Sequence, residues 1–259
     1  MEQRTIGFIG GGRITRIFLE GFKNAKVEFD QIVVYDSNDE SLKRLQKAFP
    51  QVKITNQDLG EIGALDIIFI AVHPPVVAEV IEQIKPYIQE HTILISLAPK
   101  ITIQHMQILL PQVKSIVRAN PSAPNVINEG MNPIAFSETI NEEDKVYVMK
   151  LFGTIGKTFV VEESKIEAYA VICAMGSTYF WFQLQQLLEM GIQFGLEREE
   201  AKLLIKDMMS GTVNTLFFSN LSKEEVMDLV PVRPLGEYEE MIKGFYSQKL
   251  AEIYAKIRP

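Results

Sequence analysis

An apolar strand that runs directly into a glycine turn lies near the start of this chain, and it constrains the fold more than any other feature. Residues 6–14 read IGFIGGGRI, and apolar residues then recur at helical spacing. Gly10 permits a tight turn, and Gly12 permits a ligand to approach the backbone closely. The helix that begins near Arg13 directs its free N–H groups and positive dipole end toward an anion. This pattern is typical of proteins that hold the diphosphate of a dinucleotide.

A second apolar run, residues 31–35, ends at an acid. Asp36 can accept hydrogen bonds from the hydroxyls of an adenosine ribose, with Ser37 beside it. Asp36 could instead cap the helix that follows. Because an acid at this place repels a 2′-phosphate, the sequence predicts that NADH is favoured over NADPH. Thr15 occupies the third position of the glycine motif, where Gly or Ala is usual, so we expect slightly looser packing of helix on strand there.

The first 161 residues alternate between strand and helix patterns. Alternation of this kind requires crossover connections and therefore predicts a doubly wound parallel sheet, the Rossmann type of α/β fold. In such a sheet, ligands bind beyond the carboxyl ends of the strands. After the first two strands, further strands are predicted at residues 52–54, 66–72, 91–97, 113–118, 134–136 and 158–161, with helices at 76–84, 102–110 and 142–152.

The strand patterns stop after residue 162. The sequence therefore predicts a dinucleotide-binding domain at residues 1–161 and an all-helical dimerisation and substrate domain at 162–259. Residues 168–188 carry no charge and are long enough to cross a bilayer, but their glutamines favour a helix buried between subunits. Glycines and prolines separate the four predicted helices, which span residues 164–190, 197–218, 223–229 and 235–257.

Composition excludes several classes of protein. Of the 259 residues, 47% are hydrophobic and 23% are charged, which predicts a folded core. The net charge of −7, without a basic stripe, argues against a nucleic-acid partner. Cys173 is the one cysteine and cannot form an internal disulfide, and residues 1–4 do not read as a signal peptide, so we expect a cytoplasmic protein. The histidines lie in three different predicted elements, which predicts no metal site.

The loops that follow the predicted strands supply the remaining candidates for cofactor binding. The loop after the sixth strand is stiffened by two prolines at the place where a nicotinamide ring would lie. Arg13 could contact the diphosphate or extend into solvent, and His73 could stack near the adenosine or cap the helix that begins at Pro74. The cofactor-binding candidates are Gly10, Gly11, Gly12, Arg13, Ile14, Asp36, Ser37, Ala71, Val72, His73, Pro74, Asn120 and Pro121.

These motifs resemble those of the pyrroline-5-carboxylate reductases, which pass hydride from a nicotinamide to a cyclic imine. The resemblance covers nearly the whole chain. It includes the glycine turn, the AVHP segment at residues 71–74 (the family usually has Lys in place of His73), residues 118–130 and the GIQFGL segment at 191–196. It implies an NAD(P)H-dependent oxidoreductase that reduces the C=N bond of a small cyclic imino acid, as in proline biosynthesis. It also implies a homodimer or higher homo-oligomer with interlocking helices.

The chain departs from the family in the segments that are expected to contact the substrate. The family's M-P-N-T-P is NPSAP at residues 120–124, its G-S-G-P-A-Y is AMGSTY at 174–179, and its carboxylate-gripping T-S-P-G-G-T-T is VRPLGEY at 232–238. A substrate carboxylate beside Glu237 would be repelled unless Arg233 compensates. The resemblance gives as substrate-binding candidates Ser122, Gly176, Arg233 and Glu237.

Hydride transfer requires positioning more than acid–base chemistry, because a protonated imine is already electrophilic. One hydroxyl or water would suffice as the proton source. We expect Tyr238, Ser177 or Thr178 to supply it, although Tyr238 could equally serve in packing. Two alternatives stay open. The chain could reduce or oxidise another imine or a hydroxy acid, or it could be a sensor that binds a dinucleotide without chemistry. In each case we expect small-molecule ligands and neither nucleic acid nor membrane as a partner.

Overall fold

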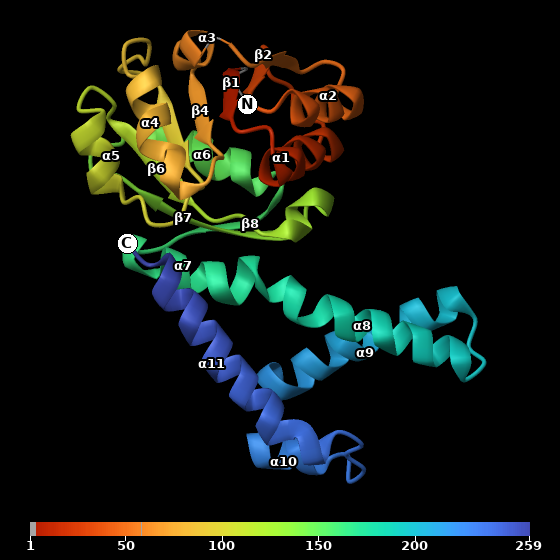
Figure 1. The fold of residues 1–259 in the computed structure, drawn as a ribbon. Coiled ribbons are helices and arrows are strands. Elements are labelled where there is room, and N and C mark those ends of the chain that lie inside the picture. The colour runs from red at the N-terminus through yellow and green to blue at the C-terminus, as the bar shows by residue number, and fades with distance from the viewer. Residues whose placement is uncertain (1–3, 58) are drawn as a thin grey trace. The chain divides into compact units, whose positions relative to one another are not determined.

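The computed structural model describes residues 4–57 and 59–259, and the chain divides into two compact units (Figure 1). The α/β unit comprises the chain up to Met175 together with Ile253–Pro259, and the helical unit comprises Gly176–Glu252. The last strand ends near the predicted division at residue 161, but the α/β unit continues beyond it because Ile166 is buried in its core. Residues 1–3, which belong to the segment searched for a signal peptide, lie outside the described residues.

One eight-stranded sheet forms the centre of the α/β unit, in the order β3-β2-β1-β4-β5-β6-β7-β8. Strands β1 to β6 pair in parallel, which confirms the doubly wound fold. The strands are β1 (Thr5–Ile9), β2 (Gln31–Tyr35), β3 (Lys53–Thr55), β4 (Ile67–Ile70), β5 (Ile93–Ser96), β6 (Ser115–Ala119), β7 (Gly130–Phe136) and β8 (Gly156–Val160).

The sheet is mostly parallel and contains one antiparallel pair. Strand β7 runs antiparallel to β6, and β8 runs parallel to β7. The connection from β6 to β7 contains only the short 3-10 helix Ala123–Ile127. A parallel pair needs a longer crossover, usually through an α-helix, so this short link suits an antiparallel partner.

Helices cover both faces of the sheet and bury two separate apolar cores. In β4, Ile67 and Phe69 join one core while Ile68 and Ile70 join the other, because successive strand residues point to opposite faces. A short helix, α3 (Leu59–Gly63), was not predicted. The first face carries α1 (Arg13–Asn24), α2 (Asp39–Ala48) and α6 (Glu142–Gly153), and the second carries α3 (Leu59–Gly63), α4 (Pro74–Ile84), α5 (Ile103–Leu109) and α7 (Ile166–Tyr169) (Figure 1).

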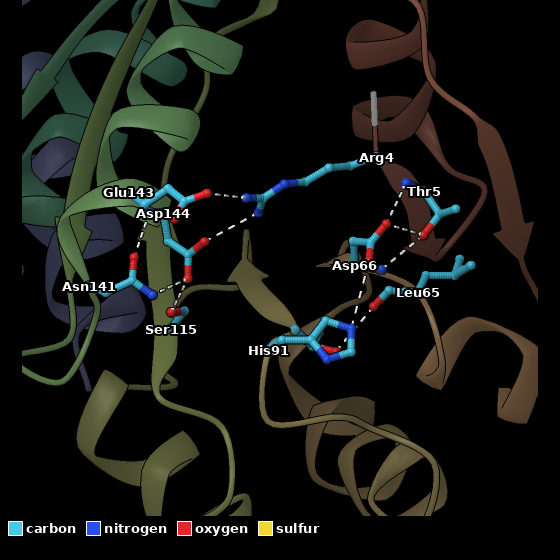
Figure 2. A network of polar contacts seen from close by, with 10 residues as sticks. Arg4, Thr5, Leu65, Asp66, His91, Ser115, Asn141, Glu143 and Asp144 are labelled. Atoms are coloured by element: carbon cyan, nitrogen blue, oxygen red, sulfur yellow. Dashed lines mark hydrogen bonds and ion pairs between the residues drawn. The ribbon is translucent and has the colours of Figure 1, made fainter. Parts of the chain in front are cut away.

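Polar contacts tie together the amino ends of the strands, at the edge opposite the glycine turn (Figure 2). Asp66 Oδ2 accepts hydrogen bonds from the backbone N–H and the hydroxyl of Thr5, at 2.8 and 2.7 Å. Asp144 Oδ1 accepts from Arg4 at 3.2 Å, and Asp144 Oδ2 accepts from Ser115 at 2.6 Å. These bonds join the start of β1 to the start of β4, and they join α6 both to β6 and to the residue before β1.

The predicted single helix at residues 164–190 is broken at its start. Separate short segments precede α8 (Gly176–Gln193), among them a π-helix at Ala170–Ala174. There the backbone N–H of Met175 donates to the carbonyl of Ala170 at 2.9 Å, the wider spacing of a π-turn. This turn admits one more residue than an α-turn, and the regular helix α8 begins directly after Met175.

The helical unit is formed by helices with few buried residues. Among its described residues, only Gly176, Leu188 and Ala201 are buried. Within the described residues, no helix is both long enough and apolar enough to cross a membrane. After α8 come α9 (Arg198–Phe218), α10 (Lys223–Asp228), the 3-10 turn Gly236–Tyr238 and the greater part of α11 (Glu239–Ile257).

Candidate dinucleotide-binding site

The glycine turn lies between β1 and α1, at the carboxyl edge of the sheet. Gly10 has a φ of 110°, and a Cβ there would lie 2.6 Å from the carbonyl oxygen of Ala71, so only glycine fits. A Cβ on Gly12 would meet no atom within 4 Å, because this position faces open space. Gly12 is also the N-cap of α1 and supplies no side-chain cap. The first N–H groups of α1 are therefore available to an anion.

Asp36 is fixed beside this turn. Its Oδ2 accepts a hydrogen bond from the N–H of Gly11 at 2.7 Å, and its Oδ1 accepts from the N–H of Asn38 at 2.8 Å. The N-cap of α2 is Asn38, whose side chain accepts from Ser41 N–H at 3.0 Å, so Asp36 does not have that role. A carboxylate oxygen can accept more than one hydrogen bond. The Asp36 carboxylate can therefore still accept a hydrogen bond from a ribose hydroxyl.

Thr15 makes a hydrogen bond inside the glycine turn. It is fully buried, and its hydroxyl donates to the carbonyl of Gly10 at 2.5 Å. The close approach in α1 occurs instead at Gly21, where a Cβ would lie 2.6 Å from the carbonyl oxygen of Asn125. The larger residue in the third motif position is therefore accommodated by an internal hydrogen bond.

A groove of about 920 Å³, here called the glycine-turn groove, opens over the turn. Its lining includes Gly11, Gly12, Ile14, Ala71 and His73. His73 occupies the N-cap position of α4, but its side chain makes no capping bond. Cationic side chains also line the groove, which complements an anionic ligand. They are Arg13, Arg16, Arg44 and Lys47.

The sequence reasoning named only Arg13 among these cations. Arg16 lies one turn further along α1, while Arg44 and Lys47 lie one turn apart on α2. The two residues of each pair are three apart in the sequence, which puts them on the same face of their helix. This spacing was the signal that the sequence offered for a cationic helix face. What the sequence could not show is that the two faces line the same groove.

A second cavity of about 180 Å³, here called the Arg118 cavity, lies where β5 and β6 end. Arg118 is 1% exposed. Its Nη1 donates to Glu163 at 3.0 Å and its Nη2 donates to Glu167 at 2.5 Å. Among the buried side-chain atoms of the described residues, Arg118 Nε alone has no partner. The cavity is lined by Leu97, Ala98, Pro99, Arg118, Ala119, Asn120, Ile166, Glu167, Ala170, Met175 and Ile257.

The groove and the cavity fit the two halves of a nicotinamide dinucleotide. A doubly wound sheet binds the dinucleotide along the carboxyl edge, with the diphosphate on the first helix. Gly12 leaves space for that diphosphate, and the small cavity has room for one flat ring. These residues would hold the cofactor, which would supply the hydride.

Other predicted residues of the α/β unit lie in the same loops. Asn120 lines the Arg118 cavity and Pro121 follows it, while Val72 lies between groove-lining residues and Pro74 begins α4. Ser37 is exposed in the loop after β2.

Ser122, a predicted substrate contact, is buried. Its hydroxyl oxygen accepts from the N–H of Met131 at 2.8 Å. This bond shapes the loop between β6 and β7. The hydroxyl of Ser122 is therefore already engaged within this loop.

The predicted proton donors and the remaining substrate candidates belong to the helical unit. Gly176, Ser177 and Thr178 begin α8, whereas Arg233, Glu237 and Tyr238 precede α11. Arg233 Nη2 donates to Glu239 Oε2 at 2.6 Å, so Arg233 pairs with Glu239 rather than Glu237. Tyr238 is 46% exposed.

The thiol of Cys173 is less reactive than a free thiol. Burial raises the pKa of the Cys173 thiol, which lowers its reactivity as a nucleophile. In residues 4–57 and 59–259, no group of three or more His, Cys, Asp or Glu side chains could hold a metal ion.

Two family models match this chain, one in each half. Residues 5–100 match the model described as NADP oxidoreductase coenzyme F420-dependent, and residues 163–253 match the model described as pyrroline-5-carboxylate reductase dimerisation. Fold and site thus define a protein with a Rossmann-type oxidoreductase domain followed by a dimerisation domain. In its second half by this model, and along most of its length by its relatives, the chain is similar to the pyrroline-5-carboxylate reductases.

Relatives match along most of the chain. The pyrroline-5-carboxylate reductase of Haemophilus influenzae is 29% identical over 213 residues, which cover 82% of this chain and 78% of that protein. The structure of the Coxiella burnetii pyrroline-5-carboxylate reductase is 26% identical, with a TM-score of 0.68 over 99% of this chain and 95% of that one. The Plasmodium falciparum pyrroline carboxylate reductase, solved with NADP bound, shares the fold at 22% identity, with a TM-score of 0.77 over 99% and 96%.

Proposed function

We propose that this protein is an NAD(P)H-dependent reductase that transfers hydride to the C=N bond of a small cyclic imino acid of the pyrroline-5-carboxylate type. The observation that carries the proposal is the pairing of a cation-lined groove over the glycine turn with a small cavity at the ends of β5 and β6. The named relatives support the C=N substrate class.

The α/β unit binds and orients the coenzyme in this proposal. The backbone at Gly11 and Gly12 and the side chain of Arg13 receive the diphosphate, and Asp36 receives the ribose. The coenzyme supplies the hydride when it is bound. What the chain contributes is positioning, since a protonated imine needs little further activation.

The helical unit would supply the substrate contacts and the proton. Tyr238, Ser177 and Thr178 are the proposed hydroxyl groups, and any one of them meets the chemical need. Glu237 would attract the positive charge of a protonated imine. Arg233 is less free to hold a substrate carboxylate, because it is paired with Glu239. We therefore expect weaker carboxylate binding than a hydroxyl-rich loop would give. Ser122 and Gly176 remain proposed substrate contacts.

We propose NADH as the favoured coenzyme. Two backbone hydrogen bonds hold the Asp36 carboxylate in place, so its charge stays beside the ribose. The cations of the glycine-turn groove complement the diphosphate, which both coenzymes carry. Titration of the protein with NADH and NADPH tests this, and tighter binding of NADPH would contradict it. Replacing Asp36 with Ser should reduce the difference between the two coenzymes.

We propose a homodimer or a higher homo-oligomer assembled through the helical unit. The match of residues 163–253 to a dimerisation domain and the exposed apolar side chains of these helices support it. The single cysteine is compatible with a reducing compartment, and we propose a cytoplasmic location on that argument.

The decisive experiment follows the absorbance of NADH with pyrroline-5-carboxylate, and then with a panel of other imines and keto acids. Oxidation of NADH by pyrroline-5-carboxylate is the expected result. Turnover of another compound alone would assign a different substrate. Coenzyme binding without any turnover would favour a dinucleotide sensor, the candidate that the Arg233–Glu239 pairing supports. If calorimetry detects no binding of either coenzyme, the proposed function fails altogether.

A further inference from the structure

We propose that Asn125 and Asn132 are positioning residues for hydride transfer, because they fix the loop that forms one wall of the Arg118 cavity. This inference rests on the proposed function, since it takes the occupant of that cavity to be the nicotinamide ring. The loop joins β6 to β7 and comprises residues 120–129, here called the ring loop. Asn120, its first residue, lines the cavity together with Ala119, the last residue of β6.

The amides of Asn125 and Asn132 form a buried pair in the α/β unit. Both residues are fully buried, and Asn125 Nδ2 donates to Asn132 Oδ1 at 2.6 Å. Asn132 Nδ2 donates to the carbonyl of Phe152 in α6 at 3.2 Å and to the hydroxyl of Thr158 in β8 at 3.3 Å. A buried polar group is costly unless it is hydrogen-bonded, so a satisfied pair specifies one arrangement of the elements that it joins. Asn125 belongs to the ring loop and Asn132 to β7, so this arrangement includes the loop.

The same pair reaches the start of the ring loop through Ser122. The Ser122 hydroxyl donates to Asn125 Oδ1 at 3.5 Å and accepts from the N–H of Met131 at 2.8 Å. Gly130 leaves the space for the Asn125 side chain, because a Cβ on Gly130 would lie 1.1 Å from Asn125 Oδ1. Ser122 follows Asn120 by two residues. The network therefore fixes the part of the loop that lines the cavity.

The far end of the ring loop is tied to α1, the helix proposed to receive the diphosphate. Asn128 Nδ2 donates to the carbonyl of Gly21 in α1 and to the carbonyl of Thr154, each at 2.8 Å. Gly21 also lets α1 approach the loop closely, since a Cβ there would lie 2.6 Å from the carbonyl oxygen of Asn125. One loop thus contacts the diphosphate helix and lines the ring cavity. Its conformation sets the place of the ring relative to the diphosphate, and a shift of about 1 Å can slow a transfer step about a hundredfold.

The first test replaces Asn125 with Ala, which removes the amide from the ring loop. The kcat for reduction of pyrroline-5-carboxylate by NADH should fall at least about tenfold, because the ring is no longer held in place. The KM for NADH should change less than about threefold, and so should the affinity for ADP-ribose, which lacks the ring. Steady-state kinetics and calorimetry measure these quantities. An unchanged kcat would overturn the proposal.

The control is Asp144→Asn, which weakens another buried polar network of the same unit, at the opposite edge of the sheet. Both variants should unfold at a lower temperature than the unaltered protein, and this is measured for each. Only Asn125→Ala should lose kcat. Equal losses of kcat in the two variants would give Asn125 a structural role only and would contradict the proposal.

A double variant, Asn125→Leu with Asn132→Leu, separates stability from positioning. Replacing both partners of a hydrogen bond with apolar groups of similar shape leaves no buried donor or acceptor unpaired between them. This variant should therefore unfold at a higher temperature than Asn125→Ala. Its kcat should stay reduced, because an apolar contact does not fix direction as the amide pair does. Recovery of kcat together with the unfolding temperature would contradict the proposal.

The closing experiment needs coenzyme alone, so it holds whichever imine the protein reduces. The emission of NADH rises when its ring is held in a protein site, and it is measured here at saturating NADH. Bound NADH should emit less in Asn125→Ala than in the unaltered protein, while Asp144→Asn should match the unaltered protein. If the unaltered protein binds neither NADH nor ADP-ribose, the proposed function fails. If it binds both and the emission of bound NADH is the same in all three proteins, the positioning role alone fails.

Discussion

Phenylalanines in the two units have opposite surroundings. In the α/β unit, Phe18 packs edge-on against Phe152 and tilted against Phe69, and all three are fully buried. In the helical unit, Phe217 and Phe218 are 69% and 77% exposed. The α/β unit thus carries its own core, whereas the helical unit leaves apolar surface for another chain to cover. The proposed coenzyme site lies in the self-contained unit, and most proposed substrate contacts lie in the other. Coenzyme binding should therefore be less sensitive to assembly than turnover.

The largest expected effect comes from charging the exposed apolar surface of the helical unit. Phe217→Asp combined with Phe218→Asp should abolish homo-oligomers, because burying each phenylalanine contributes about 1.5–3 kcal/mol and a buried carboxylate adds a further cost. Size-exclusion chromatography with light scattering measures the mass. The matched control is Ile108→Asp, because Ile108 is 72% exposed in α5 of the α/β unit and should leave the mass unchanged. An unchanged mass of the double variant would remove this surface from the interface.

Within the α/β unit, substitutions of two glycines in the glycine turn should have different effects, one on the free energy of unfolding and the other on coenzyme affinity. Gly10→Ala forces a side chain into a φ of 110° and against the carbonyl of Ala71, so the free energy of unfolding should fall by about 1–3 kcal/mol or more. Gly12→Ala meets no protein atom and should leave that free energy nearly unchanged. Its methyl group occupies the space proposed for the diphosphate, so coenzyme affinity should fall about tenfold. Denaturant unfolding and calorimetry measure the two effects. Equal coenzyme affinity of Gly12→Ala and the unaltered protein would place the diphosphate elsewhere.

A smaller effect is expected at the opposite edge of the sheet. Asp144→Asn weakens the hydrogen bonds from Arg4 and Ser115, and should lower the free energy of unfolding by about 1–3 kcal/mol without changing coenzyme affinity. Glu143→Gln is the control, because the Glu143 side chain is 79% exposed and lies 3.7 Å from Arg4. Similar unfolding curves for the two variants would show that burial of this network adds nothing to the free energy of unfolding.

The smallest effect concerns Cys173. Burial raises the pKa of its thiol, so at neutral pH less of it is thiolate than in a free thiol. Its alkylation by iodoacetamide should be slower than that of free cysteine, and the rate should rise at higher pH than for free cysteine. Mass spectrometry at a series of pH values follows the reaction. Alkylation as fast as that of free cysteine at neutral pH would contradict this.

Local pattern was enough to predict the order and type of the strands and of most helices in the α/β unit. The predicted run at residues 31–35 coincides with β2, and the apolar run before the glycine turn forms β1, because strongly apolar strands have a clear pattern. The direction of β7 was missed, since alternation along a strand does not encode how it pairs. The helix α3, from Leu59 to Gly63, was too short to show helical periodicity.

The sequence indicated the part of the candidate site that one contiguous segment forms. It did not indicate the part in which residues far apart in the sequence come together. The turn at Gly10–Gly12 was readable from adjacent residues. Arg118 meets Glu163 and Glu167 at separations of 45 and 49 residues, and no spacing rule reaches so far. A charged residue in an otherwise apolar strand was the signal that could have found it, because buried charges are rarely left unpaired.

The course of the last helix has a practical consequence. Ile253–Pro259 belong to the α/β unit, so the helical unit is an insertion tethered at both ends rather than a terminal appendage. Ile257 lines the Arg118 cavity, so trimming the final turn would breach that wall. A purification tag is therefore better fused at the amino terminus than after Pro259. A single protease nick in the loop before α11 would also leave both fragments carrying part of the α/β unit, which favours their remaining associated.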